Sequence, residues 1–249
     1  MAVADSLLVC GRISSLNASQ PCPGGQLGNC GSACIRSTDH GDTWHRGGRV
    51  SSLNASSAKG GPNECEPALL GSTGANVLLN MRAGADRLFA TSSDGGTSFG
   101  KHWRWVESSG AKVANCQGST GSTSAGNDRP MLLFTAPSNA KQSRANLTLF
   151  ISETGGQSWA ASQVVHAGPS AYSSLAATGG GCVAVAHEGG QKSTYEKIFF
   201  RKVCVNLGTG KVNVSCCLPC APVLPLSQRN IHTAGDMQVT CGRGHCGLT

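Results

Sequence analysis

An eight-residue pattern occurs three times in this chain and limits the folds that are open to it. Ser37–Trp44 reads S-x-D-x-G-x-T-W, and Ser92–Phe99 repeats it with Ser and Phe in the last two places. Ser152–Trp159 follows the pattern more loosely, with Thr154 where the other copies have Asp. The copies begin about 55 to 60 residues apart, and a repeat of about 40 to 60 residues with short strands is typical of β-propeller blades.

Each position of the pattern suits a tight turn between two strands. An Asp carboxylate can accept hydrogen bonds from backbone N–H groups of the turn, and Gly tolerates a positive φ. The aromatic residue at the end can pack between neighbouring sheets. We therefore expect Asp39 and Asp94 to be structural residues and not catalytic acids.

Short apolar segments bounded by glycine and polar residues supply the strands. The candidate strands are 6–10, 76–80, 131–135, 146–152, 182–186 and 197–203. No segment shows a sustained 3.6-residue periodicity, and the 34 glycines among 249 residues favour many tight turns. The sequence thus predicts an all-β fold, with about four blades in residues 1–215 and an irregular or disordered Cys-rich tail in residues 216–249.

Charge and hydropathy argue against two classes of protein. The formal net charge is +7, but the Lys and Arg residues are scattered and form no basic block interleaved with aromatic residues. That pattern disfavours nucleic-acid binding. No apolar stretch approaches the roughly 20 residues that a membrane span needs, so we expect no transmembrane segment.

Cysteines and glycosylation motifs indicate a compartment. The 13 Cys residues and the Asn-x-Ser/Thr motifs at Asn17, Asn54, Asn146 and Asn213 are typical of the secretory route, and so of a lysosomal or extracellular protein. Such motifs also arise by chance in a chain rich in Ser and Thr. Residues 1–10 lack the basic and apolar regions of a signal peptide.

Four further segments lie between or beside the three repeats. They are Asn63–Pro67, Val77–Arg82, Arg144–Leu149 and Gly168–Ala176. In this order and spacing they resemble the exo-α-sialidases (neuraminidases), most closely the lysosomal type, over residues 5 to about 205. The repeats then correspond to the Asp boxes of that family. The resemblance implies an incomplete six-bladed sialidase β-propeller that hydrolyses terminal sialic acids of glycoproteins, oligosaccharides or gangliosides.

The resemblance also implies a substrate clamp and a nucleophile. Arg82 and Arg144 match the second and third of three arginines that bind the sialic acid carboxylate, and a guanidinium can give a carboxylate two parallel hydrogen bonds. Tyr172 matches the nucleophile. A neutral phenol is repelled less than a carboxylate by the acid group on the anomeric carbon, provided that a base removes its proton.

Two glutamates compete for the role of that base. Glu64 keeps the Glu-Cys-x-Pro context of the family, whereas Glu66 lies at the usual spacing before Arg82. We prefer Glu64, because Gly71–Ala75 resembles a lengthened turn. Glu188 matches a supporting glutamate that orients an arginine by ion pairing.

Two features of a complete family member are not found in this chain. One is an Arg in a Phe/Tyr-Arg-Ile-Pro motif, and the other is an Asp that protonates the leaving oxygen. Alternatives to an active sialidase are therefore a catalytically inactive propeller that binds sialic acid, or a truncated gene product.

A metal site is the remaining candidate, and we expect neither a metal nor a cofactor. Its possible zinc ligands are Cys216, Cys217, Cys220, His232, Cys241, His245 and Cys246. The spacing between the two halves of this set is too loose for a regular zinc motif, so disulfides are the preferred interpretation.

Overall fold

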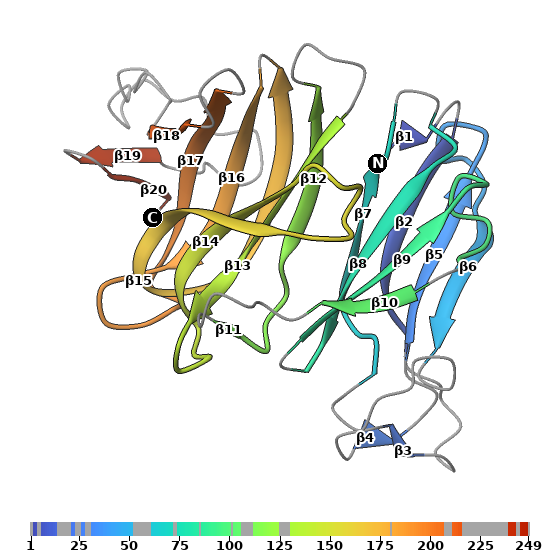
Figure 1. Cartoon of the computed structure of the whole chain (residues 1–249), viewed down its shortest axis with the longest axis horizontal. Helices are drawn as coiled ribbons and strands as arrows, with labels where there is room; N and C mark the ends of the chain where they lie inside the picture. Colours follow the sequence, from blue (N-terminus) through green and yellow to red (C-terminus); the bar gives the residue numbers. More distant parts are fainter. Residues whose placement is uncertain are drawn as a thin grey trace, which may run out of the picture.

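Figure 1 shows a computed structural model of the chain, and the regular elements among the residues that the structure describes are all strands. The structure describes residues 2–3, 6–13, 21–22, 26–27, 31–51, 61–71, 74–84, 86–100, 102–105, 112–124, 130–179, 181–206, 211–215, 239–242 and 245–248. The prediction of an all-β fold is confirmed. Within these residues, no helix is long and apolar enough to cross a membrane.

The first two sheets are four-stranded and antiparallel. The first has the order β1-β2-β5-β6, from β1 (Ala2–Val3), β2 (Ser6–Ile13), β5 (Gly31–Ser37) and β6 (His45–Ser51). The second has the order β10-β9-β8-β7, from β7 (Cys65–Leu69), β8 (Val77–Ala83), β9 (Asp86–Ser92) and β10 (His102–Trp105). A small hairpin of β3 (Pro21–Cys22) and β4 (Gln26–Leu27) stands apart from both sheets (Figure 1).

The rest of the strands form two blades that share one long strand. The third blade contains β11 (Lys112–Val113), β12 (Ser119–Ser124), β13 (Pro130–Asn139) and β14 (Ala145–Ser152). The fourth contains β16 (Cys182–Gly189), β17 (Lys197–Asn206) and β18 (Lys211–Ser215). β15 (Ala160–Gly179) pairs with β14 as far as Pro169 and with β16 from Ser170 onward. The four blades stand side by side without closing into a ring, as expected for an incomplete propeller (Figure 1).

Apolar side chains fill the three interfaces between neighbouring blades. Leu8 of the first blade packs with Leu79 of the second, and Leu78 packs with the Phe134 cluster of the third. Val185 of the fourth blade packs with Leu133 of the third. Because successive side chains of a strand point to opposite faces, adjacent Leu78 and Leu79 fill two different interfaces. This explains why the middle strands are apolar on both faces.

The repeated turns behave as their sequence predicts. In the first, the backbone N–H of Thr43 donates to Asp39 Oδ1 at 2.9 Å, and in the second the N–H of Ser98 donates to Asp94 Oδ1 at the same distance. In the third, Thr154 Oγ1 takes the place of the carboxylate and accepts from Ser158 N at 2.9 Å. The two aspartates thus hold their own turns together, and the prediction of a structural role is confirmed.

The aromatic residues that end these turns differ in their packing. Trp159 is 7% exposed and stacks on Phe89 of the preceding blade, with ring centroids 5.4 Å apart. Phe99 packs against the interface of the first two blades. Trp44 belongs to the first blade and is 40% exposed. Inter-blade packing of the aromatic is therefore confirmed for the second and third turns.

Among the cysteines that the structure describes, two disulfides join neighbouring strands and two thiols are free. Cys10–Cys34 links β2 to β5, and Cys182–Cys204 links β16 to β17. Cys65 and Cys116 are free thiols.

The tail contains β19 (Val239–Gly242) and β20 (His245–Leu248), which pair with each other. These two strands differ from the irregular backbone expected for residues 216–249. The domain boundary at residue 215 stays a prediction, and the candidate zinc ligands lie outside the side chains that the structure describes.

Candidate active site

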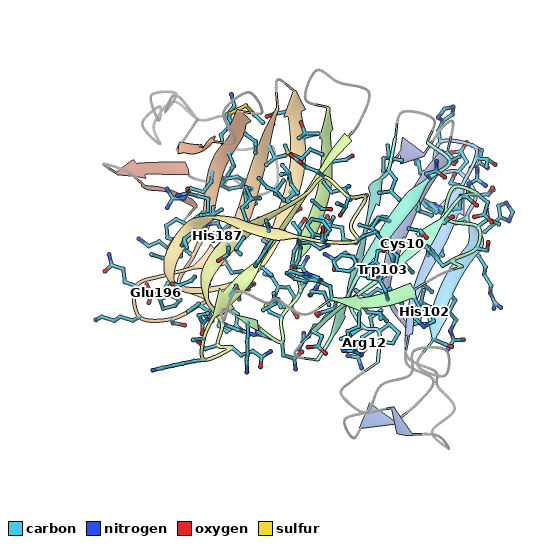
Figure 2. All side chains as sticks on the ribbon, in the orientation of Figure 1. Cys10, Arg12, His102, Trp103, His187 and Glu196 are labelled. Carbon is cyan, nitrogen blue, oxygen red and sulfur yellow. A yellow bond between two sulfur atoms is a disulfide. The ribbon has the colours of Figure 1, made fainter. Side chains whose placement is uncertain are left out.

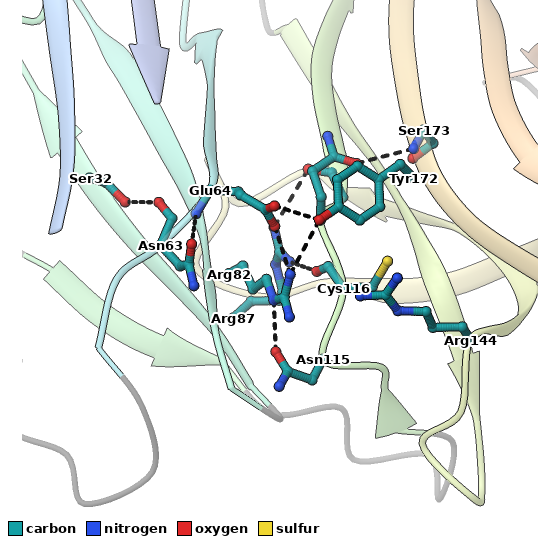
Figure 3. A network of polar contacts seen from close by, with 12 residues as sticks. Ser32, Asn63, Glu64, Arg82, Arg87, Asn115, Cys116, Arg144, Tyr172 and Ser173 are labelled. Atoms are coloured by element: carbon teal, nitrogen blue, oxygen red, sulfur yellow. Dashed lines mark hydrogen bonds and ion pairs between the residues drawn. The ribbon is translucent and has the colours of Figure 1, made fainter. Parts of the chain in front are cut away.

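Residues from separate segments meet where the second, third and fourth blades come together (Figure 3). Glu64 directly precedes β7, Arg82 lies in β8, Arg144 directly precedes β14, and Tyr172 lies in β15. The connection between β11 and β12 adds Cys116 to this group. The structure therefore brings together the four residues that the sequence analysis proposes for catalysis and substrate binding.

Tyr172 and Glu64 form the central contact of the site. The Tyr172 hydroxyl donates a hydrogen bond to Glu64 Oε1 at 2.5 Å, across 108 residues of sequence. Burial acts to raise the pKa of Glu64, but the hydrogen bonds from Tyr172 and Arg82 and the charge of Arg82 bring it below the ordinary value. Burial and the contact with Glu64 raise the pKa of Tyr172. The resting site thus pairs an ionised carboxylate with a neutral phenol.

Arg82 connects this pair to the rest of the site. Its Nη1 atom donates to Glu64 Oε2 at 2.8 Å and lies 3.4 Å from the Tyr172 hydroxyl oxygen. Its Nε atom donates to Asn115 Oδ1 at 2.7 Å. The backbone N–H of Arg82 also bonds to the Glu64 carbonyl at 2.9 Å, which continues the pairing of β7 and β8. The sheet itself therefore places the two side chains next to each other.

Glu66 lies two residues further along and has different surroundings. It pairs with Asn80 in the β7–β8 register. Burial raises its pKa to about 7, against the opposing effects of contacts with Ser119 and Thr120 and of the charge of Arg87. Of the two glutamates proposed as the base, the structure places Glu64 at the Tyr172 hydroxyl.

Arg144 lies over the ring of Tyr172, whereas Arg82 contacts its hydroxyl group. Its guanidinium carbon lies 5.6 Å from the centre of the Tyr172 ring, within the range of a cation–π contact. Its Nη1 atom donates to the hydroxyl of Tyr195 at 2.5 Å. The thiol of Cys116 is drawn beside the same guanidinium, and the side chain of Cys116 is buried (Figure 3). Arg82 and Arg144 thus place two positive charges beside the phenol.

The backbone around Tyr172 is held by side chains of other segments. Glu188 Oε2 accepts a hydrogen bond from Tyr172 N at 3.1 Å, and Gln117 Oε1 accepts from Ser173 N at the same distance. Ser119 Oγ accepts from Leu175 N at 2.7 Å. Within the described part of the chain, Glu188 forms no ion pair with an arginine, so its contact differs from the ion pair that the sequence analysis expects. Glu188 thus holds the backbone of the strand that carries Tyr172.

The sequence analysis misses Arg87, which is fully buried beneath the site. Its Nη1 atom donates to the carbonyl of Cys116 at 2.8 Å, and its Nε atom donates to Asn80 Oδ1 at 2.9 Å. Burial lowers its pKa to about 10. Its position in front of the apolar run Leu88–Ala90 is the one sequence signal that marks it as a buried charge. Arg87 anchors the segment that presents Asn115 and Cys116 to the site.

A metal ion has no evident ligand set in the part of the chain that the structure describes. No three side chains of the His, Cys, Asp and Glu type are grouped there as ligands would be.

Comparisons with known proteins define the family. A family model described as a BNR repeat-like domain matches residues 7–185, and the chain belongs to this family of BNR repeat-like domains. No curated protein matches the chain by sequence.

The solved structures that resemble the chain include sialidases. The Hadza microbial sialidase Hz136 has a TM-score of 0.59 and 21% identity, and the match covers 79% of this chain and 34% of that one. The Trypanosoma rangeli sialidase in complex with the inhibitor DANA has a TM-score of 0.53 and 21% identity, and the match covers 80% of this chain and 30% of that one. The NanB sialidase from Streptococcus pneumoniae has a TM-score of 0.50 and 15% identity, and the match covers 74% of this chain and 28% of that one. The chain thus has a sialidase-like β-propeller fold and spans about a third of the length of these proteins.

Proposed function

We propose that the chain is an exo-α-sialidase of the lysosomal type, which hydrolyses terminal α-linked sialic acids with retention of configuration. The observation that carries the proposal is the hydrogen bond from the Tyr172 hydroxyl to Glu64, flanked by Arg82 and Arg144. Glycoproteins, oligosaccharides and gangliosides are the proposed sources of the sialic acid.

The reaction proceeds in two displacements. In the first, Glu64 takes the phenolic proton while Tyr172 Oη forms a bond to the anomeric carbon, and the bond from that carbon to the glycosidic oxygen breaks. The glycosidic oxygen takes up a proton from the solvent and leaves as the aglycone alcohol. In the second, water attacks the anomeric carbon and releases one proton to the solvent, the bond to Tyr172 breaks, and the proton held by Glu64 returns to the phenolate. Two inversions give retention.

The charges of the site favour this sequence of steps. Arg82 Nη1, 3.4 Å from the phenol oxygen, stabilises the negative charge that develops as the proton leaves. Arg144 is placed to bind the substrate carboxylate with its planar guanidinium. Because the pKa of Glu64 is lowered from 4.5 and that of Tyr172 is raised from 10, the base is ionised and the nucleophile protonated at pH values between these two.

Hydrolysis of a fluorogenic aryl sialoside at acidic pH tests the proposal. An aryl alcohol leaves readily without protonation, so the assay does not depend on a general acid. We expect the 249-residue chain to release the fluorophore, and Tyr172→Phe to reduce turnover by at least about 10³-fold. Undiminished turnover in Tyr172→Phe would refute the assignment. Glu66→Gln is the matched control, because Glu66 lies two residues from the proposed base and away from Tyr172.

A second candidate function is sialic acid binding without hydrolysis. It is supported by the two family motifs that are not found in this chain, the first Arg and the acid Asp. This alternative predicts that the chain binds a sialoside but releases no fluorophore, and that Arg144→Ala removes the binding. Binding that Arg144→Ala leaves unchanged would count against both functions.

We further infer that the chain works in the secretory route, in a lysosome or outside the cell. The support is the glycosylation motifs together with two disulfides between paired strands, Cys10–Cys34 and Cys182–Cys204. Digestion with an N-glycosidase of the protein isolated from its native cells tests it. An unchanged gel mobility after digestion would argue against this location.

A further inference from the structure

Tyr195 is a second tyrosine at the site, and the packing of the fold does not require an aromatic residue at this position. It lies in the turn between β16 and β17 and is 63% exposed. Its ring therefore contributes little to the core. Its hydroxyl nevertheless accepts a hydrogen bond from Arg144 Nη1 at 2.5 Å, across 51 residues of sequence.

Glu196, the residue after Tyr195, fixes the turn that presents Tyr195. It lies in the connection between β16 and β17 of the fourth blade (Figure 2). The Glu196 carboxylate accepts backbone hydrogen bonds from Gln191, Lys192 and Ser193 at 3.1, 2.7 and 2.6 Å, and these bonds lower its pKa. A side chain at Gly190 could not fit, since its Cβ would lie 2.3 Å from the Ser193 carbonyl oxygen. The turn is thus a preorganised support, on which an aromatic side chain can bind a ligand at low entropic cost.

The hydroxyl of Tyr195 keeps its own proton for a further partner. It acts as an acceptor toward Arg144, which uses a lone pair of the oxygen and leaves the O–H free to donate. Among the residues that the structure describes, none accepts this proton. A carboxylate bound to Arg144 would present its oxygens beside the hydroxyl, and such an anion is the acceptor that a phenol hydroxyl binds most strongly.

We propose that Tyr195 is a substrate-binding residue, whose hydroxyl donates a hydrogen bond to the sialic acid carboxylate held by Arg144. The inference rests on the proposed function and adds a residue to the site. Tyr195 then has two roles, since it orients the guanidinium before the substrate arrives and contacts the same carboxylate afterwards. The ligand class is an anionic sugar with its carboxylate on the anomeric carbon.

Calorimetric binding of a methyl α-sialoside and of its methyl ester tests the inference. Both probes are measured on the full chain carrying Tyr172→Phe, so that hydrolysis does not consume them. We expect Tyr195→Phe to weaken binding of the acid by about tenfold, the loss of one hydrogen bond to a charged group. Binding of the neutral ester should change by less than about twofold, because the ester lacks the anion that the hydroxyl recognises.

The outcomes separate this inference from the proposed function. Equal weakening of acid and ester, or unchanged binding of the acid, would overturn the role of Tyr195 alone. No binding of the acid by the Tyr172→Phe parent would overturn the proposed function and this inference with it. Gln191→Ala is the control, because it alters a neutral exposed side chain of the same turn and should leave both affinities unchanged.

Discussion

The Asp-box turns and the Tyr172 site lie at opposite ends of the strands and are built in opposite ways. β14, for example, begins beside Arg144 and ends at the third turn. In the turns, a polar side chain bonds to atoms two to four residues away, as Asp94 does with Ser92 and Ser98. In the site, Glu64 bonds to residues 18 and 108 positions away. One end of the molecule is thus held by local contacts and the other by the assembly of blades.

This difference predicts that changes at the two ends will separate activity from stability. Changes in the site should lower turnover with little effect on unfolding. Changes in the turns and in the aromatic layer should lower stability and leave the affinity of the folded protein unchanged. The predictions below test that separation, beginning with the largest effect.

Removal of the proposed base should have the largest effect. Glu64→Gln cannot accept the phenolic proton, so turnover of an aryl sialoside should fall by about 10²- to 10⁴-fold, the usual contribution of a general base. In the unchanged chain, the acid limb of the pH profile should lie below the ordinary Glu value of 4.5, because the pKa of Glu64 is lowered. Steady-state rates from pH 3 to 7 provide the test. An acid limb above pH 5 would contradict the assignment of Glu64.

The aromatic layer should dominate stability. Trp159→Ala removes a buried ring that stacks on Phe89, and a change of this kind costs about 3 to 5 kcal/mol. Trp44→Ala is the matched control, because the same position of the first turn is 40% exposed. Urea unfolding measures both. If Trp44→Ala lowered the free energy of unfolding as much as Trp159→Ala does, packing at the inter-blade interface would not be the source of the stability.

The turns themselves should contribute less. Asp94→Ala removes the acceptor for Ser98 N and should lower the unfolding midpoint by about 2 to 4 °C. Thr154→Asp restores the consensus residue in the third turn and should raise the unfolding midpoint by a similar or smaller amount. Thermal unfolding followed by circular dichroism measures both variants. A fall in turnover for Asp94→Ala at a temperature where the protein is folded would contradict a purely structural role.

The effect of Glu66 should appear as a change of stability with pH. Its pKa in the folded state is about 7, above the ordinary value of 4.5, so the folded chain holds a proton that the unfolded chain has lost between these pH values. This group therefore favours folding at low pH and loses that contribution as the pH rises through about 7. Glu66→Gln should flatten the fall in stability between pH 4.5 and 7.5. Urea unfolding at several pH values gives the free energy of unfolding of both chains. An equal change of this free energy with pH in the two chains would contradict the raised pKa.

The sequence predicts the local features of the fold well. The three turns and the six candidate strands all have counterparts in the structure, because each depends on turn chemistry and apolar runs within a few residues. β15 is not predicted, since Gly168 and Pro169 interrupt its pattern and pairing with two different strands sustains it. The length of such a strand depends on its pairing with neighbouring strands, which the local sequence pattern does not reveal.

The site is predictable only through resemblance. Tyr172, Glu64, Arg82 and Arg144 are identified by motifs, and nothing in their local sequence places them together. The supporting contacts of Gln117 and Arg87 follow from the docking of blades, so the sequence alone gives no measure of them. Resemblance leaves the choice between Glu64 and Glu66 open, and the hydrogen bond from Tyr172 decides which of them lies at the phenol.

Mass spectrometry of the chain after reaction with 2,3-difluorosialic acid tests the central claim most directly. Fluoride leaves the anomeric carbon without protonation, so the reaction depends on Tyr172, its base and the carboxylate clamp alone. We predict that the chain gains one fluorosialyl group on Tyr172, that Glu64→Gln slows the gain, and that Tyr172→Phe abolishes it. Failure to gain the group, or an equal gain in Tyr172→Phe, would contradict the assignment of Tyr172 as the nucleophile.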